Sequence, residues 1–432
     1  MGGGITGLTC AYFLTQQGHD VVVHEASDRL GGKLQTTTIA GVPVELGADS
    51  FLPRDDVPLE LCRSLGLGDD LVSPAVFGAY IWHDGALRKL PSGFSYGIPV
   101  RPWAARRTGL LSTPGALRAA MEMLRFRRLR GPEPTVASFV TRRFGRQVLD
   151  HLVDPLLAGT RAGRPDEIGL ETGMREIAQL AGRRGSVIRG LRASTTEIGA
   201  GSSSFVSLRG GLARLIDALV AQLPNVRTGS RVQTLPDADA VILTTPAWET
   251  GRLLADAHPD VRTVLEGIRY ESSATVTLVF SPESFFFPAD GSGVLIPSAA
   301  GLRLTAATWY SHKWPHARPA DGSQIVRCFV GGRGRPLPDD GAIEEAAVSG
   351  LATVMGVDAR PIEIHVTRWT RGLPIFEVDH LAQIDLDDAF PSVSRIAVAG
   401  AWLTGSGIPE CIAHARRASD QVDAFLVERG SR

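Results

Sequence analysis

Three glycines at the start of the chain restrict its fold more than any other feature. The first seven residues read M-G-G-G-I-T-G, which places Gly2, Gly4 and Gly7 at the glycine positions of G-x-G-x-x-G. In a dinucleotide-binding fold these glycines allow a tight turn, close approach of the backbone to a pyrophosphate, and close packing of a helix on the sheet. Residues 8–17 suit that helix, whose N-terminus attracts phosphate through its free N–H groups and its dipole.

A strand and an acid follow at the distance that the same fold requires. Residues 20–25 read D-V-V-V-H-E, and Glu25 lies 18 residues after Gly7. This is near the spacing of the acid that accepts hydrogen bonds from an adenosine ribose. A lone glycine fingerprint is weak evidence in a chain with 48 glycines. The ordered series of glycines, helix, strand and acid therefore carries the prediction of a dinucleotide site.

The fingerprint ordinarily follows a buried strand, and no such strand precedes it in this sequence. About five apolar residues of a central strand are expected ahead of Met1. Two interpretations stay open, namely a start assigned too late and a truncated chain with a damaged centre.

A second glycine-containing segment has two interpretations. Residues 45–51 read E-L-G-A-D-S-F after an alternating stretch that predicts a hairpin turning at Gly41. A glycine at a strand end, followed by small residues, lets a loop approach a planar ligand closely. A plain turn fits the composition equally well.

Size and composition limit the function classes. A chain of 432 residues exceeds one typical core, so two domains or one domain with large insertions are expected. The formal charge of −1 argues against a dedicated nucleic-acid binder. Four separated cysteines without C-x-x-C suit a reducing cytoplasm and predict neither disulfides nor a zinc site. The ten histidines show no metal-binding spacing, and no run of about 18 apolar residues predicts a membrane span.

Two later segments of the chain are predicted to belong to the same domain as the fingerprint. Segments around 208–245 and 395–429 again show strand and helix patterns, whereas strands at 275–280, 294–297, 302–309, 325–330 and 362–369 predict an antiparallel sheet. Gly199–Ser204 is expected to cross between domains. We predict an α/β fold with a dinucleotide-binding domain of residues 1–75, 205–250 and 385–432, a second domain of residues 76–98 and 251–384 that holds this sheet, and a helical subdomain of residues 99–204.

Residues 101–130 are strongly basic. Leu117, Met121 and Leu124 fall at helical spacing, so the basic residues are expected to share a helix with an apolar face. Such a helix lies on anionic lipid, binds an acidic ligand, or simply covers the core as a solvated helix. Against the single acid Glu122 the segment holds eight arginines, Arg101, Arg106, Arg107, Arg118, Arg125, Arg127, Arg128 and Arg130.

The motifs together resemble a known family. The chain is similar to the protoporphyrinogen/coproporphyrinogen III oxidases of the bacterial heme pathway, in the amine-oxidase-like flavoprotein superfamily. The resemblance implies a Rossmann-like FAD-binding domain, with an inserted mixed antiparallel-sheet substrate domain and a helical subdomain. The segments that carry it are G-G-G-I-T-G at 2–7, E-A-S-D-R-L-G-G-K at 25–33, E-L-G-A-D-S-F at 45–51, A-L-R-K-L-P at 86–91, A-G-T-R-A-G at 158–163, L-R-G-G-L at 208–212 and G-S-G-I-P-E-C-I at 405–412.

The resemblance implies specific contacts. A porphyrinogen pocket is implied near Gly293, Leu295 and Thr308. Lys33 stands where the superfamily usually has arginine, and Ala79 where the mitochondrial enzymes have an arginine that pairs with a substrate carboxylate. The implied contacts with non-covalent FAD are Gly2, Gly4, Ile5, Thr6, Gly7, Glu25, Lys33, Gly47, Ala48, Asp49, Ser50, Val232, Trp369, Ser406, Gly407 and Ile408.

The implied reaction is the oxygen-linked oxidation of coproporphyrinogen III to coproporphyrin III, with release of hydrogen peroxide. The flavin carries the hydride step, so no catalytic side chain and no metal are expected. Arg88, Lys89 and the arginines of 101–130 are the candidates for holding the four propionates. Protoporphyrinogen IX oxidation, another flavin oxidase or desaturase, and a catalytically dead binding protein are the alternatives. The implied partners are a porphyrinogen, molecular oxygen and a ferrochelatase that receives the product, in the cytoplasm or peripherally at a membrane through residues 101–130.

Overall fold

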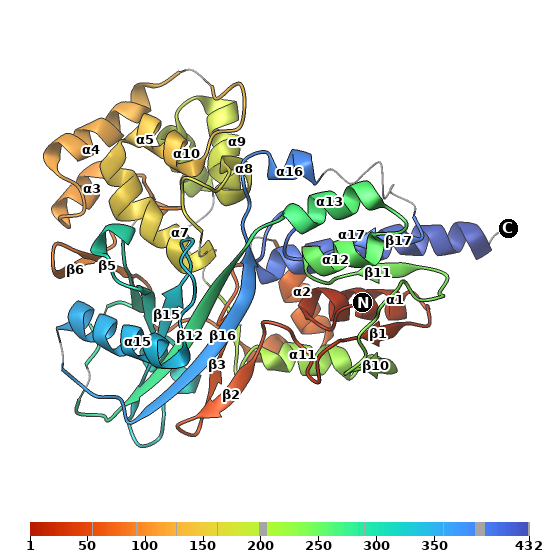
Figure 1. Ribbon diagram of the computed structural model, residues 1–432. Coiled ribbons are helices and arrows are strands. Elements are labelled where there is room, and N and C mark those ends of the chain that lie inside the picture. The colour runs from red at the N-terminus through yellow and green to blue at the C-terminus, as the bar shows by residue number, and fades with distance from the viewer. Residues whose placement is uncertain are drawn as a thin grey trace.

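The computed structural model describes residues 1–430 apart from 54, 92–93, 127, 162, 198–204, 285, 289, 357 and 385–393. The expected crossing at Gly199–Ser204 and Arg127 of the basic segment therefore lie outside the described residues. The described chain forms three parts, which are the nucleotide-binding part around α1 and α17, a large twisted sheet around β12 and β16, and a group of helices around α4 and α10 (Figure 1).

Parallel strands from distant segments form the nucleotide-binding part. β1 (Val22–His24) pairs with β10 (Asn225–Arg227), and β11 (Val241–Leu243) pairs with β17 (Ile396–Val398). Met1 and Gly2 lie between the two pairs. The nitrogen of Met1 donates to the carbonyl of Ile242 at 2.6 Å, and the nitrogen of Gly2 donates to the carbonyl of His24 at 2.8 Å. The paired strands thus come from three segments that lie far apart in the sequence.

Two long helices cover this sheet. α1 (Ile5–Gln16) begins directly after Gly4, three residues earlier than predicted, and packs against α17 (Ile408–Gly430). The first ten residues of α1 are buried, because the helix lies between the sheet and its neighbours. The remaining helices of this part are α2 (Val57–Ser64), η1 (Gly68–Asp70), α11 (Ala213–Val220), α12 (Ala247–Leu254), α13 (Pro259–Gly267) and α16 (His380–Gln383).

A seven-stranded sheet forms the second part, as predicted. Its order is β16-β12-β15-β14-β13-β5-β6, with every neighbouring pair antiparallel except β13 and β5. Helix α15 (Asp340–Met355) packs its Ile343, Ala347 and Leu351 on one face of this sheet. The strands are β5 (Tyr80–His83), β6 (Ala86–Lys89), β12 (Tyr270–Phe280), β13 (Gly293–Leu295), β14 (Leu304–Trp309), β15 (Gln324–Gly331) and β16 (Glu363–Pro374).

Further short elements lie between the longer ones. The predicted hairpin at Gly41 is confirmed, since β2 and β3 pair antiparallel across Ala40 and Gly41. The short elements are β2 (Thr36–Ile39), β3 (Val42–Glu45), β4 (Leu71–Val72), β7 (Phe94–Ser95), β8 (Ile98–Pro99), β9 (Ser207–Leu208), η4 (Ser298–Ala300), α14 (Tyr310–Lys313) and η5 (Pro315–Ala317).

The third part is helical, and its basic segment differs from the prediction. Residues 101–124 form three short helices in place of one long one, because Pro102 and Pro114 each stand in the first turn of a new helix. Leu117, Met121 and Leu124 do share a face, but that face is exposed. The helices are α3 (Pro102–Arg107), α4 (Thr113–Ala120), η2 (Met121–Leu124), α5 (Val136–Phe144), α6 (Arg146–Val148), η3 (Leu149–Val153), α7 (Asp154–Arg161), α8 (Leu170–Gly173), α9 (Arg175–Arg184) and α10 (Val187–Glu197).

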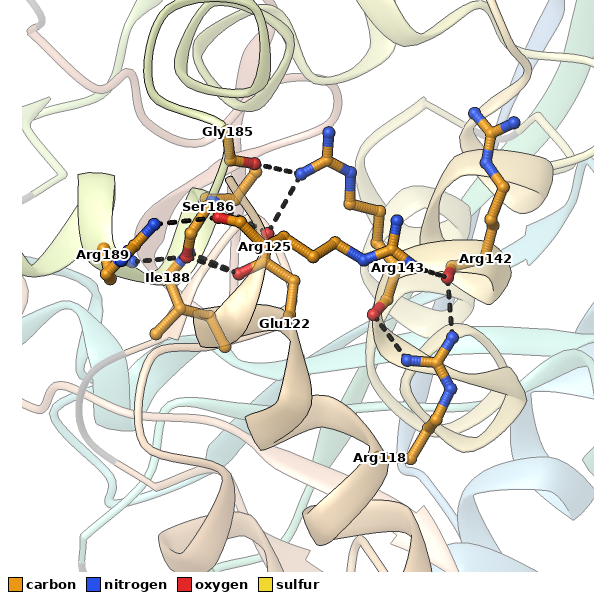
Figure 2. A network of polar contacts seen from close by, with 10 residues as sticks. Arg118, Glu122, Arg125, Arg142, Arg143, Gly185, Ser186, Ile188 and Arg189 are labelled. Carbon is orange, nitrogen blue, oxygen red and sulfur yellow. Dashed lines mark hydrogen bonds and ion pairs between the residues drawn. The ribbon is translucent and has the colours of Figure 1, made fainter. Parts of the chain in front are cut away.

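Glu122, the single acid of the basic segment, is fully buried and joins three of these helices (Figure 2). Its carboxylate accepts hydrogen bonds from the backbone nitrogens of Val187 and Ile188 at 2.8 and 3.1 Å, in the first turn of α10. It also accepts from the hydroxyl of Ser186 and from the guanidinium of Arg143, at 2.9 and 3.2 Å. A carboxylate at a helix N-terminus satisfies free N–H groups and interacts favourably with the helix dipole.

Replacing Glu122 by alanine is expected to destabilise the protein strongly. The change leaves the buried guanidinium of Arg143 and the N–H groups at the start of α10 without their acceptor, which costs roughly 3–5 kcal/mol. Chemical denaturation measures the loss. Asp150→Ala, which removes an ion pair with the exposed Arg146, is the control and should cost less than about 1 kcal/mol. Equal losses for the two variants would contradict the role of Glu122.

Candidate cofactor and substrate site

A cavity of about 1830 Å³ lies where the three parts meet. Pockets for single small ligands typically measure about 300–1,000 Å³. This cavity therefore has room for a dinucleotide together with a second molecule. Its walls come from the fingerprint loop, the loop after β3, the turn before α17, the inner face of the seven-stranded sheet, and helices α7 to α10.

The fingerprint loop forms one end of the cavity. A Cβ on Gly7 would lie 1.9 Å from the carbonyl oxygen of Gly2, so only glycine permits this packing of α1 on the loop. A Cβ on Gly4 would meet nothing within 4 Å, because that position faces the open cavity. The two glycines thus serve different purposes. Gly7 holds the helix, whereas Gly4 leaves space for a ligand.

Glu25 closes the fingerprint loop from the strand side. Its carboxylate accepts from the backbone nitrogen of Gly3 at 2.7 Å and from the backbone nitrogen of Ser27 at 2.8 Å. Each carboxylate oxygen can accept further hydrogen bonds, and the residue lines the cavity. Glu25 is therefore placed both to fix the loop and to receive hydroxyl groups of a ligand.

The turn before α17 forms the facing wall, and two buried histidines hold it. Burial lowers the pKa of His414 to about 4, so the ring is neutral at physiological pH. Its Nδ1 lies 2.8 Å from the carbonyl oxygen of Gly400 and therefore donates to it, which leaves Nε2 to accept from the hydroxyl of Thr404 at 2.7 Å. His380 donates to the carbonyl oxygens of Trp402 and Leu403. The glycine-rich turn is thus fixed from its buried side.

Lys33 brings a positive charge into the cavity. Loss of solvation in this enclosed place lowers the pKa of its ammonium below the usual range. Within the described part of the chain its ammonium makes no hydrogen bond or ion pair. An anionic group of a ligand would supply the missing partner and restore the ordinary preference for the charged form.

The loop after β3 approaches the cavity by its backbone. A Cβ on Gly47 would lie 1.9 Å from the carbonyl oxygen of Lys33 and 3.3 Å from the ring of Trp369. The loop is therefore pressed between these two residues, as close approach to a planar ligand requires. Gly47, Ala48 and Ser50 line the cavity, whereas the carboxylate of Asp49 points away from it toward Lys313.

The remaining walls are mostly apolar. The inner face of the sheet contributes Thr275, Thr305, Phe329 and Trp369, and the indole nitrogen of Trp369 donates to the hydroxyl of Thr275 at 3.2 Å. Glu176 is the one carboxylate among the described lining residues of the helical part, and it is exposed. The side chains that form the apolar wall opposite the sheet are Phe94, Tyr96, Val100, Leu156, Leu157, Met174 and Leu191.

Most predicted cofactor contacts meet in this one cavity. Two of them do not line it, since Gly7 packs inside the loop and Asp49 faces the second domain. The predicted contacts that line the cavity are Gly2, Gly4, Ile5, Thr6, Glu25, Lys33, Gly47, Ala48, Ser50, Val232, Trp369, Ser406, Gly407 and Ile408.

The predicted substrate contacts are placed differently. Gly293 and Thr308 face each other in the register of β13 and β14, and neither lines the cavity. Leu295 packs against α7 near Gly159, behind the wall. The apolar residues that do form the wall escaped prediction because they come from the β7–β8 hairpin and from helices within residues 94–191, whose periodicity gives no sign of which face meets the sheet.

The candidate basic residues also lie elsewhere. Lys89 pairs with Asp290 at the surface, and Arg88 lies beside Gly109. Neither lines the cavity, and the same is true of the described arginines between 101 and 130 and of Ala79. The side chains expected to hold substrate carboxylates therefore do not line this cavity.

The residues present fit a flavin dinucleotide. Gly4 leaves the space that a pyrophosphate needs, α1 begins beside it without an acidic residue in its first turn, and Lys33 supplies an unpaired cation. Glu25 suits a ribose, and the closely approaching Gly47 loop suits a planar ring. A pyrophosphate, a ribose and a flat ring are the parts of such a cofactor.

Comparison with known proteins agrees with this reading. The sequence profile of flavin containing amine oxidoreductases matches residues 5–423. The coproporphyrinogen III oxidase of Mycobacterium leprae is 34% identical, over 98% of this chain and 97% of that protein. The mitochondrial protoporphyrinogen oxidase of Nicotiana tabacum is 25% identical, over 99% and 94%.

A solved structure supports the fold. The crystal structure of a putative protoporphyrinogen oxidase from Exiguobacterium sp. 255-15 matches with a TM-score of 0.84 at 28% identity, over 98% of this chain and 97% of that one. The Rossmann-like flavoprotein fold predicted from the sequence is confirmed. The chain therefore belongs to the flavin containing amine oxidoreductase family and is a flavin-dependent oxidoreductase.

Proposed function

We propose that the flavin is FAD and that it is bound non-covalently. The fingerprint loop and Glu25 support the adenosine and pyrophosphate half, which a mononucleotide lacks. Cys411 is the one cysteine among the described lining residues, and burial raises the pKa of its thiol. A neutral thiol is a poor nucleophile, which argues against a covalent link to the flavin.

We propose further that the protein oxidises coproporphyrinogen III to coproporphyrin III, with oxygen as acceptor and hydrogen peroxide as product. The observation that carries this proposal is the full-length similarity to coproporphyrinogen III oxidases at 34% identity, against 25% for the mitochondrial protoporphyrinogen oxidase. Protoporphyrinogen IX is the alternative substrate. Transfer of the product to a ferrochelatase belongs to the same proposal.

The residues of the cavity have simple tasks in such a reaction. Bound FAD supplies the hydride acceptor for a methylene bridge of the porphyrinogen. The apolar wall of Leu156, Leu157, Met174 and Leu191 binds and orients the macrocycle against the sheet face and excludes water from it. Glu176, an exposed carboxylate that lines the cavity, would accept a proton and pass it to solvent.

We also propose that the helical part contacts an anionic membrane. Leu117, Met121 and Leu124 recur at helical spacing and are 54%, 52% and 71% exposed, and Phe126 beside them is 78% exposed. Apolar residues grouped this way on a surface mark an interaction site. Arg118 and Arg125 both donate to the carbonyl oxygen of Arg142, and Arg189 donates to that of Arg125 (Figure 2). The guanidinium of Arg189 also lies 4.7 Å from the ring centroid of Phe126. A bilayer with anionic headgroups offers an apolar phase for the exposed apolar side chains and negative charge for the arginines.

Integral insertion is not part of this proposal. Within the described residues, none of the helices has the length and apolar character that crossing a bilayer demands. The proposed contact is peripheral, and each basic residue near an anionic surface contributes about 1 kcal/mol to the attraction between the protein and that surface.

Gly4→Val should abolish FAD binding without unfolding the protein. The new side chain would occupy the open cavity, where a Cβ at this position meets no protein atom within 4 Å. Flavin absorbance of the purified protein and its melting temperature measure the two effects. Gly7→Val is the matched control and should lose both flavin and stability, because its Cβ would collide with the carbonyl of Gly2. Flavin at wild-type occupancy in Gly4→Val would contradict the proposed site, and flavin that precipitates with acid-denatured wild-type protein would contradict non-covalent binding.

Coproporphyrinogen III should be the better substrate. The measurement is kcat/KM for both porphyrinogens under air, followed by porphyrin fluorescence and peroxide release. A charge-assisted contact contributes roughly 1.5–3 kcal/mol, so pairing of the two additional propionates would separate the substrates by a factor of about ten or more. A preference for protoporphyrinogen IX would favour the alternative, and a yellow protein that oxidises neither would point to a binding protein.

Leu117→Asp/Leu124→Asp should weaken binding to vesicles of phosphatidylglycerol. Two carboxylates in the exposed stripe oppose both burial in lipid and attraction to anionic headgroups. Co-sedimentation with vesicles measures the effect. Ile362→Asp, on the sheet part and 66% exposed, is the control and should bind as wild type does. Wild-type protein that fails to sediment with anionic vesicles, or that binds neutral phosphatidylcholine equally well, would defeat the proposal.

A further inference from the structure

We infer that Arg327 is a positioning residue of the flavin site, which holds the Gly47 loop from behind and places a positive charge beneath it. The inference rests on the proposed FAD site and concerns a residue that lies outside the cavity. It follows from three features of this side chain, which are its burial, its hydrogen bond to the loop, and the charges around it.

Arg327 is fully buried in the middle of the seven-stranded sheet. It lies on β15, with Thr277 opposite on β12 and Thr308 opposite on β14. A guanidinium in such a place loses its hydration, and an apolar residue of similar size would avoid that loss. The sheet alone gives no reason for an arginine at this position, so the reason must lie in what the guanidinium contacts.

The guanidinium contacts the loop that lines the cavity. Its Nη2 donates to the carbonyl oxygen of Gly47 at 2.6 Å, and its charged carbon lies 5.4 Å from the ring centroid of Phe329. Gly47 and Phe329 both line the cavity, from the loop and from the sheet. Arg327 is thus separated from the cavity by one layer of residues.

Two residues that follow β14 in the sequence also bind the same loop. Asp49 accepts from the ammonium of Lys313 at 2.8 Å and from the indole nitrogen of Trp314 at 3.3 Å. Burial alone would raise the pKa of Asp49, but Lys313 and Arg327 hold it well below the usual range. The loop is therefore anchored through Asp49 at one point and through the Gly47 carbonyl at another.

Arg327 has more donors than its surroundings use. Its Nε and Nη1 have no hydrogen-bond partner among the described residues, and Nη1 stays 3.8 Å from the carboxylate of Asp49. That carboxylate is already engaged by Lys313. A residue selected only for stability would satisfy its donors, since unpaired buried donors are unfavourable. The arrangement favours a function for the charge itself.

The neighbouring acid compensates this charge only in part near neutral pH. Glu45 is buried beside Arg327, and its carboxylate accepts from the nitrogen of Leu212 and the hydroxyl of Thr36. Burial raises the pKa of Glu45 to about 7, with Arg327 opposing this effect and Asp49 adding to it. The remaining titratable neighbour, Tyr310, accepts through its hydroxyl from the nitrogen of Glu45 and stays neutral because burial raises its pKa.

A positive charge beneath the flavin wall has a definite consequence. A flavin that accepts electrons gains negative charge, and preorganised positive groups stabilise charge where it develops. Arg327 should therefore make the reduction potential of the bound flavin more positive. Through the Gly47 carbonyl it should also strengthen FAD binding.

Arg327→Met is the direct test. The midpoint potential of the bound flavin should shift to more negative values, and the Kd for FAD should rise roughly three- to tenfold. Arg327→Lys should keep a potential close to that of wild type. Arg333→Met is the control, because Arg333 is also buried and also donates to a backbone carbonyl, that of Ile296, but contacts no lining residue of the flavin loop. It should lose stability without a shift in potential.

Two outcomes would overturn the inference. The first is a wild-type potential and FAD affinity in Arg327→Met with only the melting temperature lowered, which would make Arg327 structural. If that variant does not fold, Glu45→Gln provides the test, because it removes the negative charge that Glu45 carries above its pKa of about 7. Above that pH the midpoint potential of the flavin bound to Glu45→Gln should be more positive than that of wild type, and below it the two potentials should be equal. Equal potentials at both pH values are the second overturning outcome. Wild-type protein that binds no flavin would defeat the FAD proposal and the inference together, whereas the other results leave the FAD proposal intact.

Discussion

The contact between Gly7 and the carbonyl of Gly2 is the constraint on which the site depends. Because no side chain separates them, α1 starts directly at the loop and directs its first N–H groups into the cavity. α17 packs along α1, and this packing brings the second glycine-rich turn to the opposite wall. One close backbone contact at the start of the chain thus fixes two of the cavity walls.

The loop of residues 45–51 joins the nucleotide-binding part to the sheet. Its cavity side consists of residues without bulk, Gly47 and Ala48, and its other side is bound by Lys313 and Arg327 of the second part. A movement between the two parts would therefore change the wall that faces the flavin. This coupling explains why an ion-paired carboxylate, Asp49, occurs in a segment that otherwise needs only small residues.

The sequence predicted those features of the site that are local. The positions of Gly2, Gly4 and Glu25 depend on spacing within one loop, helix and strand, and the sheet strands follow from alternation within each strand. The motif predicts a cofactor contact for Asp49. Neighbouring residues of an extended loop point to opposite sides, however, and the carboxylate of Asp49 points to Lys313. The pairing of Gly47 with Arg327 spans 280 positions, and no pattern within a single segment reveals it.

The helical part shows the same limit at the scale of a domain, and it also shows how two surfaces are connected. Periodicity grouped Leu117, Met121 and Leu124 correctly on one face, but whether that face meets the core or the outside depends on what packs there. The answer comes from Glu122, which shares η2 with Met121 and Leu124, is buried, and caps α10 (Figure 2). Leu191 of α10 lines the cavity, so the helix that Glu122 caps also contributes to a wall of the site. The described arginines beside the stripe do not line the cavity, so the charge on that surface is separate from the polar groups at the cavity itself.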